Sequence, residues 1–160
     1  MQQGVPENAS RVVPGLYQGG RPQPGQLAFD VLVLMAKEYQ PTAANFPGVK
    51  HILYAPIEDD FSYASPEERV AIRQAATFVA QALRAKQCVL VTCNMGLNRS
   101  GVVSALAICR NNPKLPADVA IRLVGQGKQG ELWRSMKYWY VSHATRSRSR
   151  SCKMVELGPP

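Results

Sequence analysis

The sequence predicts an α/β fold, in which a central, mainly parallel sheet of four to five strands is flanked by helices. Two patterns lead to this prediction. Short runs of β-branched and aliphatic residues have the length and composition of buried strands. Longer segments with apolar residues at helical spacing lie between and after them, and this order is typical of parallel sheets covered by helices. A chain of 160 residues has the length of one domain.

Four segments have the composition of strands. They are Val12–Tyr17, Asp30–Met35, His51–Tyr54 and Cys88–Thr92. The last of these reads CVLVT, which is short, uncharged and rich in β-branched residues. We therefore expect it to be a buried strand in the interior of the sheet.

The strongest helix signal follows Ser65. Ser65 has the character of an N-cap, Pro66 suits the first helical position, and Glu68 completes a capping box. Apolar residues then recur at helical spacing and should face the sheet. They are Ile72, Ala75, Ala76, Val79, Ala82 and Leu83.

Three more helices are expected towards the end of the domain. Gly101–Cys109 contains no charged residue, which predicts a central and largely buried helix. Pro116 should open a helix that continues to about Val124. Leu132, Met136, Trp139, Tyr140 and His143 predict a final amphipathic helix.

The segment from Cys93 to Ser100, CNMGLNRS, joins the predicted buried strand to the predicted buried helix. The N–H groups at a helix N-terminus can bind an anion such as a phosphate group. The same setting, with Arg99 nearby, favours the thiolate form of Cys93 and makes it a candidate nucleophile. Arg99 offers a planar fork for two phosphate oxygens, and the Ser100 hydroxyl could assist the sulfur as it leaves.

The rest of the loop is predicted to bind the phosphate group of the substrate. Together with Arg99, the substrate-binding residues are Asn94, Met95, Gly96, Leu97 and Asn98. A phosphate ester also needs a carboxylic acid that protonates the leaving oxygen. Asp59 is the preferred candidate and Asp60 the alternative, although Glu58-Asp59-Asp60 could also be a solvated acidic turn.

The loop resembles the signature of the cysteine-dependent protein phosphatases, in which a cysteine and an arginine are separated by five residues. The segment Val13–Pro22 resembles the strand and turn near the start of domains in the dual-specificity branch, and Pro56–Asp59 resembles their acid loop. The resemblance spans roughly residues 11 to 143. It implies a protein-tyrosine-phosphatase-like fold and a phosphocysteine intermediate. One position differs, because the family usually has a histidine immediately before the nucleophile and this chain has Thr92.

These boundaries divide the chain into an N-terminal extension (residues 1–10), a phosphatase domain (11–143) and a basic, disordered tail (144–160). The formal net charge is +8, and the tail carries alternating arginine and serine residues. Such a tail could make weak contacts with nucleic acid or an acidic membrane surface. It could equally be a solubilising end that has no partner.

The sequence has no apolar run of membrane-spanning length and no visible secretory signal, so a cytoplasmic location is expected. A reducing compartment would also preserve a reactive thiol. His51 and His143 lie far apart without a cysteine or histidine cluster, so no metal site is predicted. No cofactor is expected, and the oligomeric state is left open.

The favoured function is hydrolysis of phosphotyrosine, and also of phosphoserine or phosphothreonine, in proteins. The loop side chains are uncharged, whereas lipid-phosphate members of the family tend to carry lysines there. Phosphatase action on phosphoinositides or on RNA 5′-phosphate ends is the alternative. A module that binds phosphorylated partners without turnover is a second class of function.

Overall fold

The computed structural model describes residues 4–59 and 65–125. Its five strands form one sheet in the order β1-β2-β5-β3-β4. The strands are β1 (Ser10–Val13), β2 (Leu16–Gly19), β3 (Val31–Ala36), β4 (His51–Ile57) and β5 (Val89–Thr92). Strand β1 pairs with β2 in antiparallel orientation, and the other neighbouring pairs are parallel. The carboxyl ends of β2, β5, β3 and β4 therefore lie at the same edge of the sheet.

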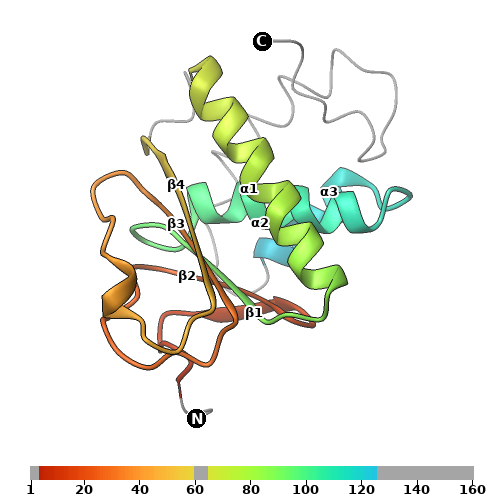
Figure 1. The fold of residues 1–160 in the computed structure, drawn as a ribbon. Helices are drawn as coiled ribbons and strands as arrows, with labels where there is room; N and C mark the ends of the chain where they lie inside the picture. The colour runs from red at the N-terminus through yellow and green to blue at the C-terminus, as the bar shows by residue number, and fades with distance from the viewer. Residues whose placement is uncertain (1–3, 60–64, 126–160) are drawn as a thin grey trace.

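The helices pack on one face of this sheet (Figure 1). They are α1 (Pro66–Arg84), α2 (Asn98–Asn111) and α3 (Ala117–Gly125), with a short 3₁₀ turn, η1 (Ala43–Asn45), between β3 and β4. Helix α2 lies between α1 and α3 and is buried from Arg99 to Cys109. Helix α1 begins at the predicted capping box, with the Ser65 hydroxyl accepting from Glu68 N at 3.1 Å.

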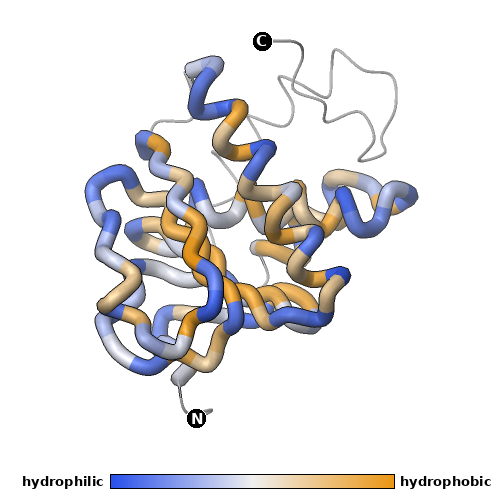
Figure 2. The backbone as a smooth tube through the Cα atoms, in the orientation of Figure 1, coloured by the Kyte–Doolittle hydropathy of each residue, from blue (hydrophilic) through white to orange (hydrophobic). Residues whose placement is uncertain are grey.

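The core has two parts, one on each face of the sheet. Alternate residues of β3 point to opposite faces, with Val33 facing the helices and Leu32 facing the other way. The second face is covered by Phe29 and Phe46 from the loops around β3. Figure 2 shows the apolar colour gathered where strands and helices meet, with hydrophilic colour in the outer loops.

The predicted fold class is confirmed, because the sheet is five-stranded, mostly parallel and flanked by helices. One strand differs from expectation. The single strand predicted over 12–17 is two antiparallel strands, β1 and β2, which are joined by a tight turn. Pro14 and Gly15 form this turn, and Gly15 has a φ of +81°, which favours glycine.

Several predictions fall on residues that the structure does not describe. These are the final helix over 132–143, the basic tail, and Asp60 as the alternative acid. The division into extension, domain and tail also stays a prediction. Among the helices of residues 4–59 and 65–125, none is long and apolar enough to cross a membrane.

Candidate active site

Cys93 follows β5 directly and lies at the carboxyl edge of the sheet, between that strand and α2. Its side chain is a free thiol and is 3% exposed. The Sγ atom lies 3.3 Å from the Ser100 hydroxyl oxygen, which is a sulfur–hydroxyl hydrogen bond. The loop therefore brings the predicted nucleophile and its predicted hydroxyl partner together within the first turn of the helix.

Glycine is required in the middle of the loop. Gly96 has a φ of +68°, a region that side chains other than glycine rarely adopt. A Cβ atom there would also meet the backbone at the end of β2, at 2.5 Å from Gly20 N. The loop therefore rests directly on β2, and hydrogen bonds on either side of Gly20 hold it there. Cys93 N donates to Gly19 O and Arg21 N donates to Asn94 O, each at 3.2 Å.

Arg99 is fully buried, and an acid that the sequence did not predict holds it in place. Glu38 accepts two parallel hydrogen bonds, from Nη1 at 2.7 Å and from Nη2 at 2.6 Å. The Ile57 carbonyl accepts a further bond from Nη1 at 3.0 Å. These contacts use the end of the guanidinium group. The edge formed by Nε–H and the remaining Nη2 hydrogen is left for another acceptor, since a guanidinium has five donors.

The ion pair fixes the charge of both partners. The bidentate hydrogen bonds from Arg99 lower the pKa of Glu38 from 4.5 to about 2. Burial acts to lower the pKa of Arg99, but the hydrogen bonds to Glu38 and the negative charges of Asp59 and Cys93 outweigh it. The pKa of Arg99 is therefore raised. A buried, permanently charged guanidinium beside the thiol sulfur is suited to a dianionic ligand.

Asp59 lies at the free edge of this guanidinium. Its Oδ1 atom is 3.2 Å from Arg99 Nε, and its side chain is 56% exposed. The carboxylate comes from the segment after β4, which is tied to α1 because Glu58 N donates to Glu68 Oε1 at 2.8 Å. Glu68 also accepts from Ser65 N at 2.9 Å, so one carboxylate caps the helix and holds the acid segment. The preferred acid candidate is thus close to the arginine and accessible to solvent.

The loop side chains differ in exposure. Met95 is 65% exposed, Asn94, Leu97 and Asn98 are half-buried, and Gly96 is buried. Within the described residues, the Asn98 Oδ1 atom is buried without a hydrogen-bond partner. Met95 therefore has the most exposed side chain of the loop.

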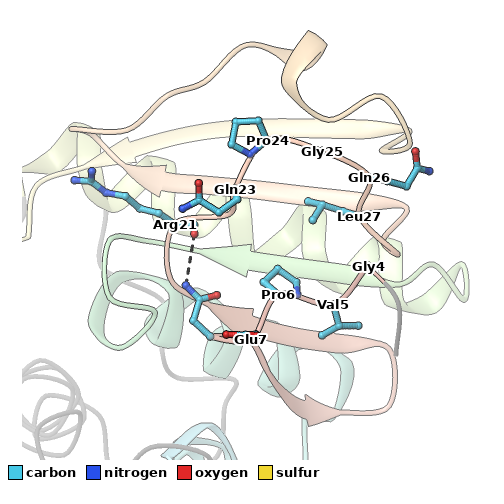
Figure 3. Close-up of a pocket in the computed structure, with 11 residues that line it drawn as sticks. Gly4, Val5, Pro6, Glu7, Arg21, Gln23, Pro24, Gly25, Gln26 and Leu27 are labelled. Atoms are coloured by element: carbon cyan, nitrogen blue, oxygen red, sulfur yellow. Dashed lines mark hydrogen bonds between the residues drawn. The ribbon is translucent and has the colours of Figure 1, made fainter. Parts of the chain in front are cut away.

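A hollow of about 520 Å³ lies between the N-terminal segment and the segment that follows β2 (Figure 3). Gly4–Asn8 line one wall, and Arg21 and Gln23–Leu27 line the other. The Arg21 backbone forms its edge and donates to the Asn94 carbonyl of the loop. The Arg21 guanidinium packs over the Tyr39 ring at 5.3 Å from the ring centre. The hollow and the loop thus share Arg21 as a common boundary.

Two residues of this site were missed by the sequence reasoning. Glu38 follows β3 by two residues, and its position at the carboxyl end of a buried strand was the available signal. Gln18 is a polar residue in β2, and its Nε2 atom donates to Gly96 O at 2.8 Å and to Leu97 O at 3.4 Å. The available signal in the sequence was a polar residue two positions after Leu16, and therefore on the same face of the strand.

No protein-family model matches the sequence, and no curated protein matches it. Solved structures match its fold. A mouse putative dual specificity phosphatase complexed with zinc tungstate is 19% identical, with a TM-score of 0.65 over 93% of this chain and 98% of that chain. Human DUSP28 is 20% identical, with a TM-score of 0.62 over 86% of this chain and 96% of that chain. PTPMT1 in complex with PI(5)P is 15% identical, with a TM-score of 0.61 over 88% of this chain and 99% of that chain. The chain therefore has the fold of these phosphatases.

Proposed function

We propose that the protein is a cysteine-dependent phosphatase that hydrolyses phosphotyrosine, and also phosphoserine or phosphothreonine, in proteins. The observation that carries this proposal is the arrangement around Arg99. Glu38 holds the end of the guanidinium group, while the Nε atom, 3.2 Å from the Asp59 carboxylate, makes no hydrogen bond within the described residues. This Nε edge has the two parallel donors that two phosphate oxygens require.

In the first step, the Cys93 thiolate attacks phosphorus opposite the leaving oxygen. A phosphorus–sulfur bond forms and the ester P–O bond breaks. Asp59 in its acid form gives its proton to the leaving oxygen, so the alcohol or phenol departs neutral. Arg99 and the N–H groups at the start of α2 carry the charge on the other phosphate oxygens.

In the second step, water attacks the phosphocysteine. The Asp59 carboxylate takes a proton from this water, the phosphorus–sulfur bond breaks, and inorganic phosphate is released. Ser100 donates a hydrogen bond to the departing sulfur, for which the 3.3 Å separation is suitable. The thiolate is restored, and no cofactor enters the cycle.

The loop side chains support a monophosphate on a protein over a more highly charged ligand. Among Asn94, Met95, Leu97 and Asn98, none carries a charge that could meet a second phosphate group. Met95 is exposed and apolar, which suits contact with an aromatic ring. Hydrolysis of phosphoinositides is the second candidate, because a solved structure with this fold, PTPMT1, was determined in complex with PI(5)P.

Single-turnover kinetics with an aryl phosphate test the proposal. Wild-type protein should release one equivalent of phenol rapidly and form a phosphocysteine that mass spectrometry locates on Cys93. Cys93→Ser should abolish turnover but still bind inorganic phosphate. Stoichiometric capture of unchanged substrate by the wild-type protein would instead identify a binding module.

A substrate panel then separates the phosphatase classes. Phosphopeptides, phosphoinositides and RNA with 5′-phosphate ends are compared by kcat/KM at one pH and salt concentration. We expect phosphotyrosine peptides to be the best substrates. Preference for a phosphoinositide or an RNA end would retain the proposed chemistry but overturn the proposed substrate class.

A cytoplasmic location remains part of the proposal, since the thiolate mechanism needs a reducing compartment.

A further inference from the structure

Gln18 is a buried polar side chain that contacts the loop but takes no part in the chemistry described above. It is 2% exposed and comes from β2. Its Nε2 atom donates to the carbonyl oxygens of Gly96, at 2.8 Å, and Leu97, at 3.4 Å. In the part of the chain that the structure describes, its Oε1 atom has no hydrogen-bond partner.

The unpartnered oxygen indicates that this amide does not serve only to fill space in the core. A leucine or methionine would fill the same space without burying an unsatisfied oxygen, which is costly. The amide cannot be reversed to relieve this cost, because Oε1 would then face two carbonyl oxygens. The side chain is therefore suited to one task, which is to donate to the loop carbonyls.

Those two hydrogen bonds set the direction of the loop N–H groups. In a planar, trans peptide the carbonyl and the following N–H point in opposite directions. Because Gln18 draws the carbonyls of Gly96 and Leu97 towards β2, the N–H groups of Leu97 and Asn98 point away from β2. The Asn94 carbonyl accepts from Arg21 N on the same side, so three peptide units of the loop have this orientation.

The residue before the nucleophile does not perform this task. The Thr92 hydroxyl donates to the Val33 carbonyl at 2.9 Å, which ties β5 to β3. Thr92 lies on the same face of β5 as Leu90, whose side chain belongs to the core on the face away from the helices. Among the described side chains, the one with hydrogen bonds to the loop carbonyls is thus Gln18 and not Thr92.

We propose that Gln18 is a positioning residue for the phosphate site, which aims the N–H groups of the loop at the anion and thereby supports the thiolate of Cys93. This inference rests on the proposed function, because it concerns the same loop. It assigns a role to a strand residue that never touches the substrate.

The test compares three variants of the full-length protein. Gln18→Met keeps the size of the side chain and removes the donor. Gln18→Glu keeps the shape and places an acceptor against two carbonyl oxygens. Thr92→Val is the matched control. It removes a buried hydrogen bond from a side chain to a backbone carbonyl, at the carboxyl end of the neighbouring strand β5, and this bond does not involve the loop.

Three measurements are made on each variant. They are the thermal midpoint, the rate of Cys93 alkylation by iodoacetamide at pH 7, and the protection of Cys93 from that reagent by inorganic phosphate. Gln18→Met should weaken phosphate protection about tenfold and slow the alkylation of Cys93 about tenfold. Gln18→Glu should have a larger effect. Thr92→Val should lower the thermal midpoint and leave both thiol measurements within about twofold of wild type.

Equal thiol behaviour of folded Gln18→Met and wild type would overturn the inference. It would also fail if Thr92→Val shifted both thiol measurements as much as Gln18→Met, because the effect would then be a general loss of stability. If Gln18→Met does not fold, Gln18→Glu decides by the same criteria. Failure of the proposed function is distinguishable, because wild-type protein would then show no turnover of an aryl phosphate, whereas the role of Gln18 is judged on phosphate protection and on the reactivity of the thiol.

Discussion

The ion pair between Glu38 and Arg99 gives the sharpest prediction about the site. In Glu38→Gln the shape of the side chain is retained and its charge is lost. The amide can accept from one guanidinium nitrogen but cannot balance the buried positive charge. Leaving a buried charge without its partner is strongly destabilising. The protein should therefore be less stable, and the guanidinium should be less well aligned for phosphate.

The pKa of Glu38 gives the size of the effect. The fall from 4.5 to about 2 is a difference of about 2.5, which corresponds to at most about 3.4 kcal/mol. The Glu38 side chain is 40% exposed, so solvent screening reduces this value. We expect Glu38→Gln to lose about 1–2 kcal/mol of unfolding free energy at pH 7. The kcat/KM for an aryl phosphate should fall at least about tenfold.

Urea unfolding as a function of pH measures this loss. Because the pKa of Glu38 is lowered in the folded state, its stabilisation is complete above its unfolded value of 4.5 and is lost as the pH falls towards 2. The difference in unfolding free energy between wild type and Glu38→Gln should be constant from about pH 7 to pH 6. At pH 3 it should be about half as large.

Glu58→Gln is the control, because Glu58 is also paired with a cation, Lys37, but both side chains are mostly exposed. This variant should match wild type at every pH. A difference between wild type and Glu38→Gln that is the same at pH 7 and pH 3 would show that the ionised carboxylate contributes nothing. The charge of Glu38 would then not be what stabilises the buried Arg99.

Three further substitutions test other parts of the site. Gly96→Ala should reduce phosphate protection of Cys93 at least about tenfold, because a Cβ would meet the Gly20 backbone; unchanged protection would show that the loop can move away. Asp59→Asn should slow the hydrolysis of alkyl phosphates about 100-fold or more and that of activated aryl phosphates less. Equal slowing of both would show that Asp59 is not the general acid. Glu68→Ala should lower the free energy of unfolding by about 1 kcal/mol. It should also slow the hydrolysis of alkyl phosphates more than that of aryl phosphates, because Glu58 N loses its acceptor. An unchanged ratio of the alkyl to the aryl rate would show that Glu68 caps the helix without holding the segment that carries Asp59.

The loop itself could be predicted from the sequence because its parts are contiguous. Cys93, Arg99 and Ser100 lie within eight positions of the printed sequence, between a strand and a helix that were both recognised by composition. Local spacing alone brings the thiol to the helix N-terminus. The capping box at Ser65 was predictable for the same reason, since Ser65 and Glu68 are three residues apart.

Glu38 and Gln18 could not be found in this way. Glu38 is 61 positions from Arg99, and Gln18 is 78 positions from Gly96. Their contacts depend on strand order, which hydrophobic periodicity does not determine. The turn at Pro14-Gly15 is a different case. Its turn residues are visible in the sequence, but the apolar residues on both sides of them predict one continuous strand.

Strand order explains how these distant residues meet. The parallel strands run β2-β5-β3-β4, and each contributes one group at its carboxyl end. Gln18 lies in β2, Cys93 follows β5, Glu38 follows β3 and Asp59 follows β4. The central position of β5 places Cys93, the proposed nucleophile, between a donor that acts on the loop carbonyls and two carboxylates that act on Arg99.

This order divides the proposed phosphate site into two halves. On the β2 side, Gln18 orients backbone N–H groups through hydrogen bonds to carbonyl oxygens. On the β3 and β4 side, Glu38 and Asp59 align and balance a guanidinium group. In the part of the chain that the structure describes, the hydrogen bonds and ion pairs of the two halves share no residue. The N–H cradle and the arginine fork can therefore be weakened one at a time, which is what the Gln18 and Glu38 variants do.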